Sequence, residues 1–281
     1  MYKLSDGRIF KCLKKPIIRN NRDLTRYEKF YSSFCAKLEK ADSLTDLKEL
    51  VLPEEIVLDK KDKVIGYYYN YENMEDVSTF FQNTNDLTKI SEYFKLLLKT
   101  IETVHGQKVV VPDLITSSNV LYDEKKNIIR LIDYDGLQIG NIPTNVISGK
   151  LNYLGNPILK SNKYVDRDGL YTSKIDELSI LLDYLFQLTG LNVSSIKAFQ
   201  KYYRNEWDRV WNRVNREQIQ SLFNSIGIDD EGIINGYINL FSGIEENPEA
   251  RIIIDKLSSQ YELTGKTSPN GGFKILKKKR L

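Results

Sequence analysis

Two carboxylates and one amide that can act together lie in the segment VVVPDLITSSNVLYDEKKNIIRLIDYDG, residues 109–136. Asn119 and Asp133 bracket a short expected hairpin, and Asp113 lies in the polar loop before it. Hard cations such as Mg²⁺ take oxygen ligands, and an Asn carbonyl with an Asp carboxylate, completed by phosphate oxygens, can hold a metal-nucleotide. Asn119 and Asp133 are therefore candidate Mg²⁺ ligands, and Asp113 remains free to orient a hydroxyl nucleophile.

Each of these residues also has an ordinary structural interpretation. Asp113 would be a cap or turn acid, Asn119 a turn residue and Asp133 an acid at a strand end. The pair Asp135-Gly136 has the usual chemistry of a hairpin corner, which leaves Asp133 unexplained. The helices and strands predicted around these residues distinguish a metal-nucleotide site from ordinary turn and cap residues.

The first 70 residues or so predict strands and one helix. Residues 2–15 alternate around a Ser-Asp-Gly turn, as an antiparallel hairpin does. Asp23 is the expected N-cap of a helix, because apolar residues follow it at helical spacing. The runs 51–59 and 63–71 predict two strands on either side of the charged turn DKKDK.

The rest of the chain is mostly helical in pattern. A stripe from Ile90 to Val104 predicts a helix that His105-Gly106 ends. The segment KIDELSILLDYLFQL, residues 174–188, is apolar on almost every side and predicts a helix that is buried all round, with Asp176 in its first turn. Further helices are expected at about residues 194–206, 208–225 and 230–243.

The composition excludes several kinds of chemistry and of location. Two cysteines and a single histidine in 281 residues do not make a disulfide framework, a zinc site or a Ser-His mechanism with a recognisable nucleophile motif. No run approaches the roughly 18 apolar residues of a membrane helix, and there is no signal-peptide core, so we expect a cytoplasmic protein without a membrane span. A net charge of +3 argues against nucleic acid as a partner, although the basic end GFKILKKKRL is a weak signal for an anionic one.

In motif order, the sequence resembles the protein kinase superfamily, in a divergent, bacterial-type Ser/Thr kinase-like form without a Gly-rich loop. A helix that ends in a histidine, a catalytic loop HRDxxxxN and a DFG motif correspond to TVHGQKVVVPDLITSSN and LIDYDG. By this resemblance, Asp113 is the catalytic-loop aspartate, Asn119 a metal-binding amide and Asp133 the metal-binding aspartate.

Further stretches match the same family. KIDELSILLDYLFQLTG resembles the helix whose buried aspartate, here Asp176, caps the backbone of the catalytic loop, and ENPEARIIIDKL resembles the late segment that carries an arginine, here Arg251. LPEEIVLDKKDKVIGYYYNYE resembles the strand pair that leads into the nucleotide hinge, which implies nucleotide-binding positions at Tyr69 and Tyr71.

Two charged residues of the N-terminal part complete the resemblance. Lys11 resembles the lysine that grips the nucleotide phosphates, and Glu28 resembles its ion-pair partner on the first helix. The ordinary interpretation of both is a solvated charge.

The sequence also departs from the family pattern. The first fifteen residues hold only Gly7 where a GxGxxG motif is expected, and the glycine of the DFG motif is Asp135. The loop has six steps from Asp113 to Asn119 instead of five, and Ile115 stands where protein Ser/Thr kinases have a lysine.

The resemblance implies a bilobal α+β fold of the protein kinase type. We expect a reduced β-rich N-lobe over residues 1–72, a helical C-lobe over 73–262 and a basic tail over 263–281. The implied activity is transfer of the γ-phosphoryl group of ATP, held with Mg²⁺, to a hydroxyl acceptor such as Ser or Thr of a protein. Three alternatives stay open: a pseudokinase that binds or scaffolds, an enzyme with a small-molecule acceptor, and an enzyme that transfers AMP.

Overall fold

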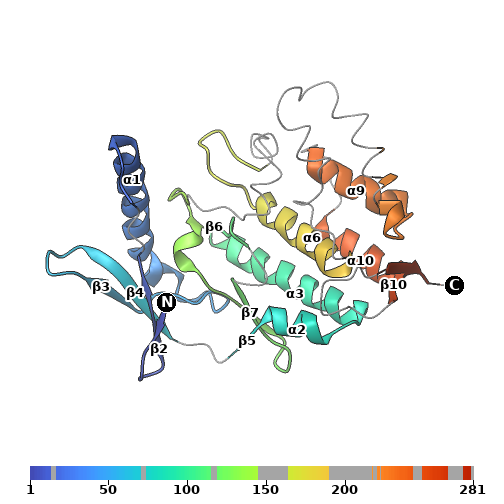
Figure 1. The fold of residues 1–281 in the computed structure, drawn as a ribbon, viewed down its shortest axis with the longest axis horizontal. Coiled ribbons are helices and arrows are strands. Elements are labelled where there is room, and N and C mark those ends of the chain that lie inside the picture. The colour runs from blue at the N-terminus through green and yellow to red at the C-terminus, as the bar shows by residue number, and fades with distance from the viewer. Residues whose placement is uncertain are drawn as a thin grey trace.

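The structure is a computed structural model, and it describes residues 1–13, 17–70, 74–114, 119–144, 164–189, 217, 220–221, 223–242, 249–264 and 275–279. A small antiparallel sheet and a long helix, α1, lie at one end of the molecule, and packed helices form the other (Figure 1). This is the bilobal α+β architecture that the sequence predicts, with a sheet at one end and helices at the other. The N-terminal elements are β1 Tyr2–Lys3, β2 Arg8–Cys12, α1 Asn21–Leu38, a 3₁₀ turn Ala41–Leu44, β3 Glu55–Leu58 and β4 Val64–Asn70.

The elements that follow belong mostly to the helical part. They begin with β5 Glu75–Asp76, α2 Val77–Asn83, α3 Leu87–Gly106, β6 Val109–Val110, β7 Val120–Asp123, β8 Ile128–Leu131, a 3₁₀ turn Tyr134–Gly136 and β9 Gln138–Ile139. They continue with α6 Lys174–Thr189, α9 Glu231–Ser242, α10 Ala250–Gln260, β10 Tyr261–Thr264 and β11 Ile275–Lys278.

The N-terminal sheet has the strand order β1-β2-β4-β3, and all its pairs are antiparallel, which confirms the predicted hairpin and strand pair. Lys11 on β2 pairs directly with Tyr67 on β4, so the two side chains leave the sheet on the same face. Gly66 permits this close pairing, since a Cβ there would collide with the carbonyl oxygen of Lys11 and the ring of Phe10. The sheet therefore directs Lys11 and Tyr67 together toward the rest of the molecule.

Helix α1 begins at Asn21, three residues before the start at Leu24 that a cap at Asp23 implies. Asn20 is the N-cap, and its side chain accepts a hydrogen bond from the backbone N–H of Asp23 at 2.9 Å. The prediction that Asp23 caps the helix was wrong, because Asn20 takes that role and Asp23 lies in the first turn. The helix buries only Phe34, Lys37 and Leu38, which belong to its last two turns.

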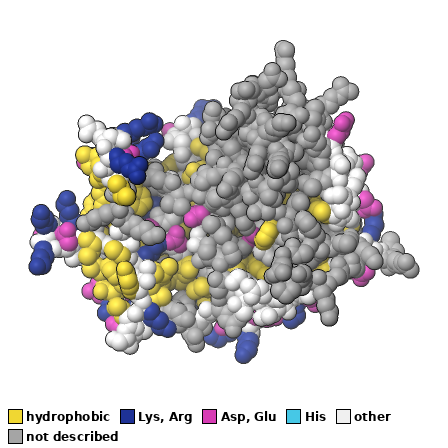
Figure 2. Space-filling view, viewed as in Figure 1, with side chains coloured by type: hydrophobic (Ala, Val, Ile, Leu, Met, Phe, Trp, Pro, Cys, Tyr) yellow, Lys and Arg dark blue, Asp and Glu magenta, His cyan; other side chains and the backbone are white. Residues whose placement is uncertain are grey.

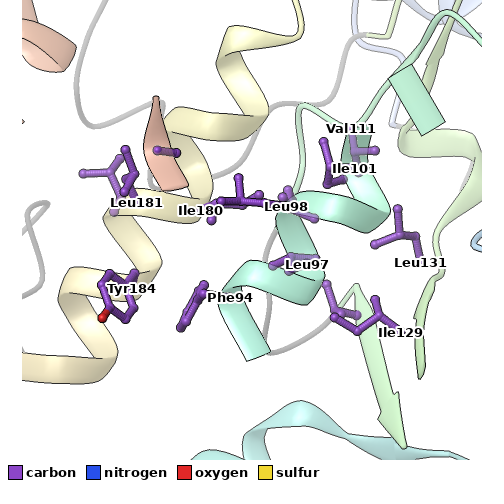
Figure 3. Close-up of a cluster of buried hydrophobic side chains, with 14 of the residues drawn as sticks. Phe94, Leu97, Leu98, Ile101, Val111, Ile129, Leu131, Ile180, Leu181 and Tyr184 are labelled. Atoms are coloured by element: carbon purple, nitrogen blue, oxygen red, sulfur yellow. The ribbon is translucent and has the colours of Figure 1, made fainter. Parts of the chain in front are cut away.

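The core of the helical part centres on α3, which packs against α6 (Figure 3). The predicted stripe on α3 is confirmed, since no member is more than 1% exposed: Ile90, Tyr93, Phe94, Leu97, Ile101 and Val104. Helix α6 is buried on nearly all sides, as its sequence predicts. Full burial of one such side chain contributes about 1.5–3 kcal/mol, so these helices form a firm base for the loops that leave them.

The hairpin β7–β8 has the predicted position. Its first pair is Val120 with Leu131, and the backbone N–H of Ile132 donates to the carbonyl of Asn119 at 3.0 Å. Asn119 and Asp133 therefore leave the hairpin at the same end, as the sequence predicts.

The C-terminal part differs from the prediction in several elements. Helix α9 is confirmed, whereas α2 and α10 were not predicted as helices. The predicted helix over 194–206 lies outside the described residues, and so does most of the one over 208–225, of which residues 223–225 are helical. Strand β11 lies within the basic end and pairs antiparallel with β10, so residues 275–278 belong to a two-stranded sheet.

Among the residues that the structure describes, large hydrophobic side chains are exposed mainly on the N-terminal part. In Figure 2 they gather over the end of the molecule that the sheet and α1 form. The most exposed ones of that part are Met1, Tyr2, Ile17, Ile18, Leu24, Ile56 and Leu58. Among the described residues, no helix combines the length and the apolar character that crossing a membrane needs.

Asp176 ties the helical core to the segment before Asp113. Its side chain is fully buried, and its Oδ2 accepts a hydrogen bond from the N–H of Val111 at 2.9 Å and lies 2.7 Å from His105 Nε2. Burial raises the pKa of Asp176, and the contacts with His105 and Val111 oppose this shift. The capping role expected for Asp176 is confirmed, and His105 has a structural contact.

We expect Asp176→Ala to lower the free energy of unfolding by about 3 kcal/mol, because it leaves the buried N–H of Val111 without its partner. Urea unfolding followed by circular dichroism measures the loss. Glu177→Ala, in the same turn but in the more exposed pair with Lys174, is the matched control and should cost about 0.5 kcal/mol or less. Equal losses in both variants would contradict this structural role.

Candidate functional site

Asn119 and Asp113 are in direct contact. The Nδ2 of Asn119 donates a hydrogen bond to the backbone carbonyl of Asp113 at 2.7 Å and lies 3.5 Å from its Oδ2. The donors of this amide are thereby turned to Asp113, and the amide oxygen is left as an acceptor that a cation can use. Burial raises the pKa of Asp113, while the Asn119 amide and the Lys11 charge lower it.

Asp133, two residues after the end of β8, has a left-handed backbone with φ 74° and ψ 50°. A non-glycine residue in this conformation is uncommon, and such outliers cluster at functional sites. A Cβ on Gly136 would lie 3.1 Å from Asp133 Oδ2 and 3.9 Å from Asp113 Cβ. The missing side chain of Gly136 therefore lets Asp113 and Asp133 converge on one small space.

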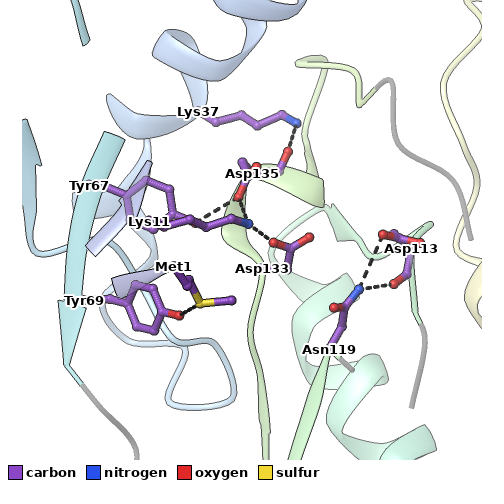
Figure 4. A network of polar contacts seen from close by, with 9 residues as sticks. All are labelled: Met1, Lys11, Lys37, Tyr67, Tyr69, Asp113, Asn119, Asp133 and Asp135. Carbon is purple, nitrogen blue, oxygen red and sulfur yellow. Dashed lines mark hydrogen bonds and ion pairs between the residues drawn. The ribbon is translucent and has the colours of Figure 1, made fainter. Parts of the chain in front are cut away.

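Lys11 reaches this space from the sheet. Its Nζ forms ion pairs with Oδ1 of Asp133 and with Oδ1 of Asp135 (Figure 4). The three side chains are only 19%, 27% and 18% exposed, respectively. One ammonium thus lies between two carboxylates of the same short turn.

Asp135 is held by further hydrogen bonds. Tyr67 is the direct partner of Lys11 on the neighbouring strand β4, and its hydroxyl donates to Asp135 Oδ1 at 2.9 Å. Burial raises the pKa of Tyr67 well above its ordinary value, and the nearby Asp135 carboxylate raises it further, so the hydroxyl keeps its proton and donates. The carboxylate of Asp135 therefore has two donors from two neighbouring strands.

The last turn of α1 is joined to the same turn by two reciprocal hydrogen bonds. The Nζ of Lys37 donates to the backbone carbonyl of Asp135 at 2.8 Å, and the hydroxyl of Tyr134 donates to the backbone carbonyl of Lys37 at 2.6 Å. Lys37 is only 3% exposed. Burial lowers its pKa to about 8, and the Asp135 carboxylate partly opposes the shift.

Glu28 does not take part in this arrangement. It lies exposed in the half of α1 that projects beyond the sheet, and no ion pair joins it to Lys11 in the described part of the chain (Figure 1). Nine residues separate Glu28 from Lys37, and they span about 13 Å of helix at about 1.5 Å per residue. The pairing expected from the sequence is therefore replaced: Asp135 stands beside Lys11, and α1 reaches the site through Lys37.

Three other expected residues are placed as follows. Tyr69 is buried on β4, and its hydroxyl donates to the sulfur of Met1 at 2.8 Å. Burial, and to a lesser extent Asp135, raises the pKa of Tyr69. Tyr71 lies outside the described residues, and Arg251 is exposed in the first turn of α10.

The donor set fits a divalent cation only in part. Among the described residues, no group of three or more His, Cys, Asp and Glu side chains could hold a metal ion. Asn119 and Asp133 supply two hard oxygen donors beside a space that a Cβ on Gly136 would fill, and Mg²⁺ usually completes its shell with water and phosphate oxygens. The residues therefore fit a cation that completes its shell with water or with phosphate oxygens.

Sequence reasoning missed Lys37, Tyr67 and Gly136 and left Asp135 without a role. Lys37 had a usable signal, because it follows Phe34 by three residues and so interrupts the apolar stripe of α1 with a charge. The signal for Asp135 was its place in the position of the motif glycine.

Comparisons with known proteins find similar solved structures but no match by sequence. No protein-family model matches the chain, and no curated protein matches it. Among solved structures, it is similar to the Cydia pomonella Granulovirus kinase PK-1, with a TM-score of 0.48 and 14% identity over 89% of this chain and 84% of that one. The bacterial type expected from the sequence stays a prediction.

The buried Lys37 predicts a pH dependence of stability. Its folded-state pKa of about 8 lies below the ordinary value of about 10.4, so the unfolded state binds more protons between these pH values. We expect the free energy of unfolding of the wild type, relative to Lys37→Met, to rise by up to about 3 kcal/mol from pH 7 to pH 10. Urea unfolding at several pH values measures this difference.

Lys40→Met is the matched control, because Lys40 lies in the turn after α1 and is exposed. Its difference from the wild type should not change over the same range. A difference for Lys37→Met that is equally flat would contradict the burial of a charged ammonium.

Proposed function

We propose that the protein is an ATP-dependent phosphotransferase that transfers the γ-phosphoryl group to a hydroxyl acceptor, such as Ser or Thr of a protein. The observation that carries this proposal is the convergence of Asp113, Asn119 and Asp133 around Gly136, with Lys11 facing them from the sheet. Phosphoryl transfer needs little covalent chemistry from a protein, because positioning and charge neutralisation supply most of the catalysis. Aspartate, asparagine and lysine side chains can position a substrate and neutralise charge.

Each residue has a distinct role in the proposal. Lys11 binds phosphate oxygens, because its ammonium is the cation that the sheet presents to this space. Asp113 accepts a hydrogen bond from the acceptor hydroxyl and orients it, and its raised pKa favours taking up a proton more than an exposed aspartate would. Asn119 keeps Asp113 in place through the hydrogen bond to its carbonyl.

Asn119 and Asp133 would hold Mg²⁺. When bound, this cation neutralises charge on the phosphate oxygens. The left-handed backbone of Asp133 directs its carboxylate to the side of the turn on which Asp113 lies. Asp135 keeps Lys11 beside this carboxylate.

A second candidate is a pseudokinase that binds a nucleotide or a partner without turnover. It is favoured by the turn between β1 and β2, which offers one glycine, Gly7, to cover phosphates, and by the Lys11 ammonium on the proposed metal ligand Asp133. A kinase-fold enzyme with a small-molecule acceptor, or one that transfers AMP, would use the same residues.

Labelled ATP separates these functions. We expect the wild type with Mg²⁺ to transfer label from the γ position and none from the α position, and Asp133→Ala to lose about 10³-fold or more of the rate, as loss of a preorganised charge does. Label from the α position would show AMP transfer instead. Absence of any transfer together with absence of Mg²⁺-dependent ATP binding would overturn the enzyme proposal.

Gly136 gives a milder test of the same space. In Gly136→Ala the new Cβ lies 3.1 Å from Asp133 Oδ2, so the carboxylate has to shift by a few tenths of an ångström. We expect the stability to change by about 1 kcal/mol or less, because the φ of Gly136 suits alanine, and the transfer rate to fall by about tenfold or more. Gly106→Ala, where no atom lies within 4 Å of the new Cβ, is the control and should leave the rate unchanged.

A further inference from the structure

We propose that Asp135 is a positioning residue that retains Lys11 and so releases Asp133 for a divalent cation. This inference rests on the proposed function, because it concerns the same site. Lys11 contacts both carboxylates, but Asp133 is the one that leaves the hairpin beside Asn119. Asp135 lies two residues further on in the same turn, among side chains of the sheet and of α1.

The Lys11 ammonium needs a second carboxylate partner if Asp133 is to bind a cation. Within the described residues, the ion pairs of Lys11 are with Asp133 and Asp135. If Asp135 lacked its charge, the ammonium would keep a single carboxylate partner, which is also the proposed cation ligand. A half-buried ammonium is costly to leave unpaired, so lysine and metal would compete for Asp133. With Asp135 present, Lys11 keeps a partner when Asp133 turns to a cation.

The surroundings fix Asp135 for this role. Tyr67 donates to the same Oδ1 that Lys11 contacts, at 2.9 Å, and Lys37 donates to the backbone carbonyl at 2.8 Å. Tyr134 returns a hydrogen bond of 2.6 Å to the carbonyl of Lys37. Donors from β2, β4 and α1 thus hold one residue, and a carboxylate with so many constraints does not have to be ordered when a ligand binds.

The expected pairing of Lys11 with an acid on the first helix is therefore reorganised. The acid comes from the turn that also carries Asp133, and the helix contributes a buried lysine to the backbone of that turn. Helix α1 consequently reaches Lys11 through Asp135, because Lys37 holds the backbone of the residue that pairs with the Lys11 ammonium. Asp135 therefore links the position of α1 to the freedom of Asp133 to bind a cation.

The test is a double-mutant cycle on the nucleotide-free protein, with Mn²⁺ alone as the probe. Electron paramagnetic resonance of free Mn²⁺ measures its affinity for the wild type, Asp135→Asn, Lys11→Met and the double variant. We expect Asp135→Asn to weaken binding by about fivefold or more, and Lys11→Met to restore it in that background. In the wild type, Lys11→Met should change the affinity about twofold or less.

The effect of Lys11→Met on Mn²⁺ affinity should therefore differ between the wild type and Asp135→Asn. This difference distinguishes retention of Lys11 by Asp135 from an effect of net charge alone. If only net charge mattered, Lys11→Met would strengthen Mn²⁺ binding equally in both backgrounds, and that result would overturn the inference. Unchanged affinity in Asp135→Asn, or no Mn²⁺ binding by the wild type, would overturn it as well. Asp123→Asn is the matched control, because Asp123 is 19% exposed and lies at the far end of the same hairpin.

A second variant covers the case in which Asp135→Asn does not fold. If Asp135→Asn fails to fold, Tyr67→Phe removes one hydrogen bond to the same carboxylate and should weaken Mn²⁺ binding in the same direction by about twofold or more. The cycle uses no ATP, so failure of the labelled-ATP experiment with a positive cycle would reject phosphoryl transfer and keep the role of Asp135. Transfer of the γ label, together with Mn²⁺ affinities that do not differ among the four proteins, would keep phosphoryl transfer and reject the role of Asp135.

Discussion

The ammonium of Lys11 is shared by two carboxylates of one short turn, and the placement of the surrounding elements follows from this contact. A partly buried group of three charges is stable only when its partners are held in good geometry, because each charge has given up part of its water. Strand β2 has to present Lys11 on the face where β4 presents Tyr67, which the direct pairing of the two residues ensures. Gly66 allows that pairing, since no side chain fits between the two strands at its position.

The helical part supplies the fixed side of the contact. Helices α3 and α6 bury their apolar faces against each other, and Asp176 on α6 holds the backbone just before Asp113. The hairpin β7–β8 then carries Asn119 and Asp133 to the same end. A rigid base thus orients one set of polar groups, while the sheet and α1 bring the other set, and the turn Tyr134–Gly136 is where they meet.

Elements with a strong period and residues fixed by short spacing could be predicted from the sequence. The stripe of α3 and the all-round apolar α6 follow from burial, and the ends of a short hairpin must lie together, which placed Asn119 and Asp133 correctly. Contacts between distant segments could not be derived in the same way. The separation of seventeen residues between Lys11 and Glu28 does not determine which turn of α1 faces the sheet.

The same limitation explains the residues that were missed. Asp135 was interpreted as a departure from a motif, and its role depends on Lys11 and Tyr67, which lie 124 and 68 positions away in the chain. Lys37 has the sequence signal of a charge within an apolar stripe, but its acceptor is a backbone carbonyl that has no signature in the sequence. In both cases the structure was needed to identify the partner.

The balance of charge around Lys11 and Asp133 bears on how a nucleotide would bind. Three aspartates, Asp113, Asp133 and Asp135, stand against Lys11 and Lys37 in the described part of the site. Formally this leaves one excess negative charge, and the short turn near Gly7 offers few backbone N–H groups to anions. Phosphates that arrived alone would lie beside the carboxylates of Asp113 and Asp133 and be repelled. The positive charge for binding therefore has to come with the nucleotide as a divalent cation, so an enzyme built on this site requires the metal for binding and not only for turnover.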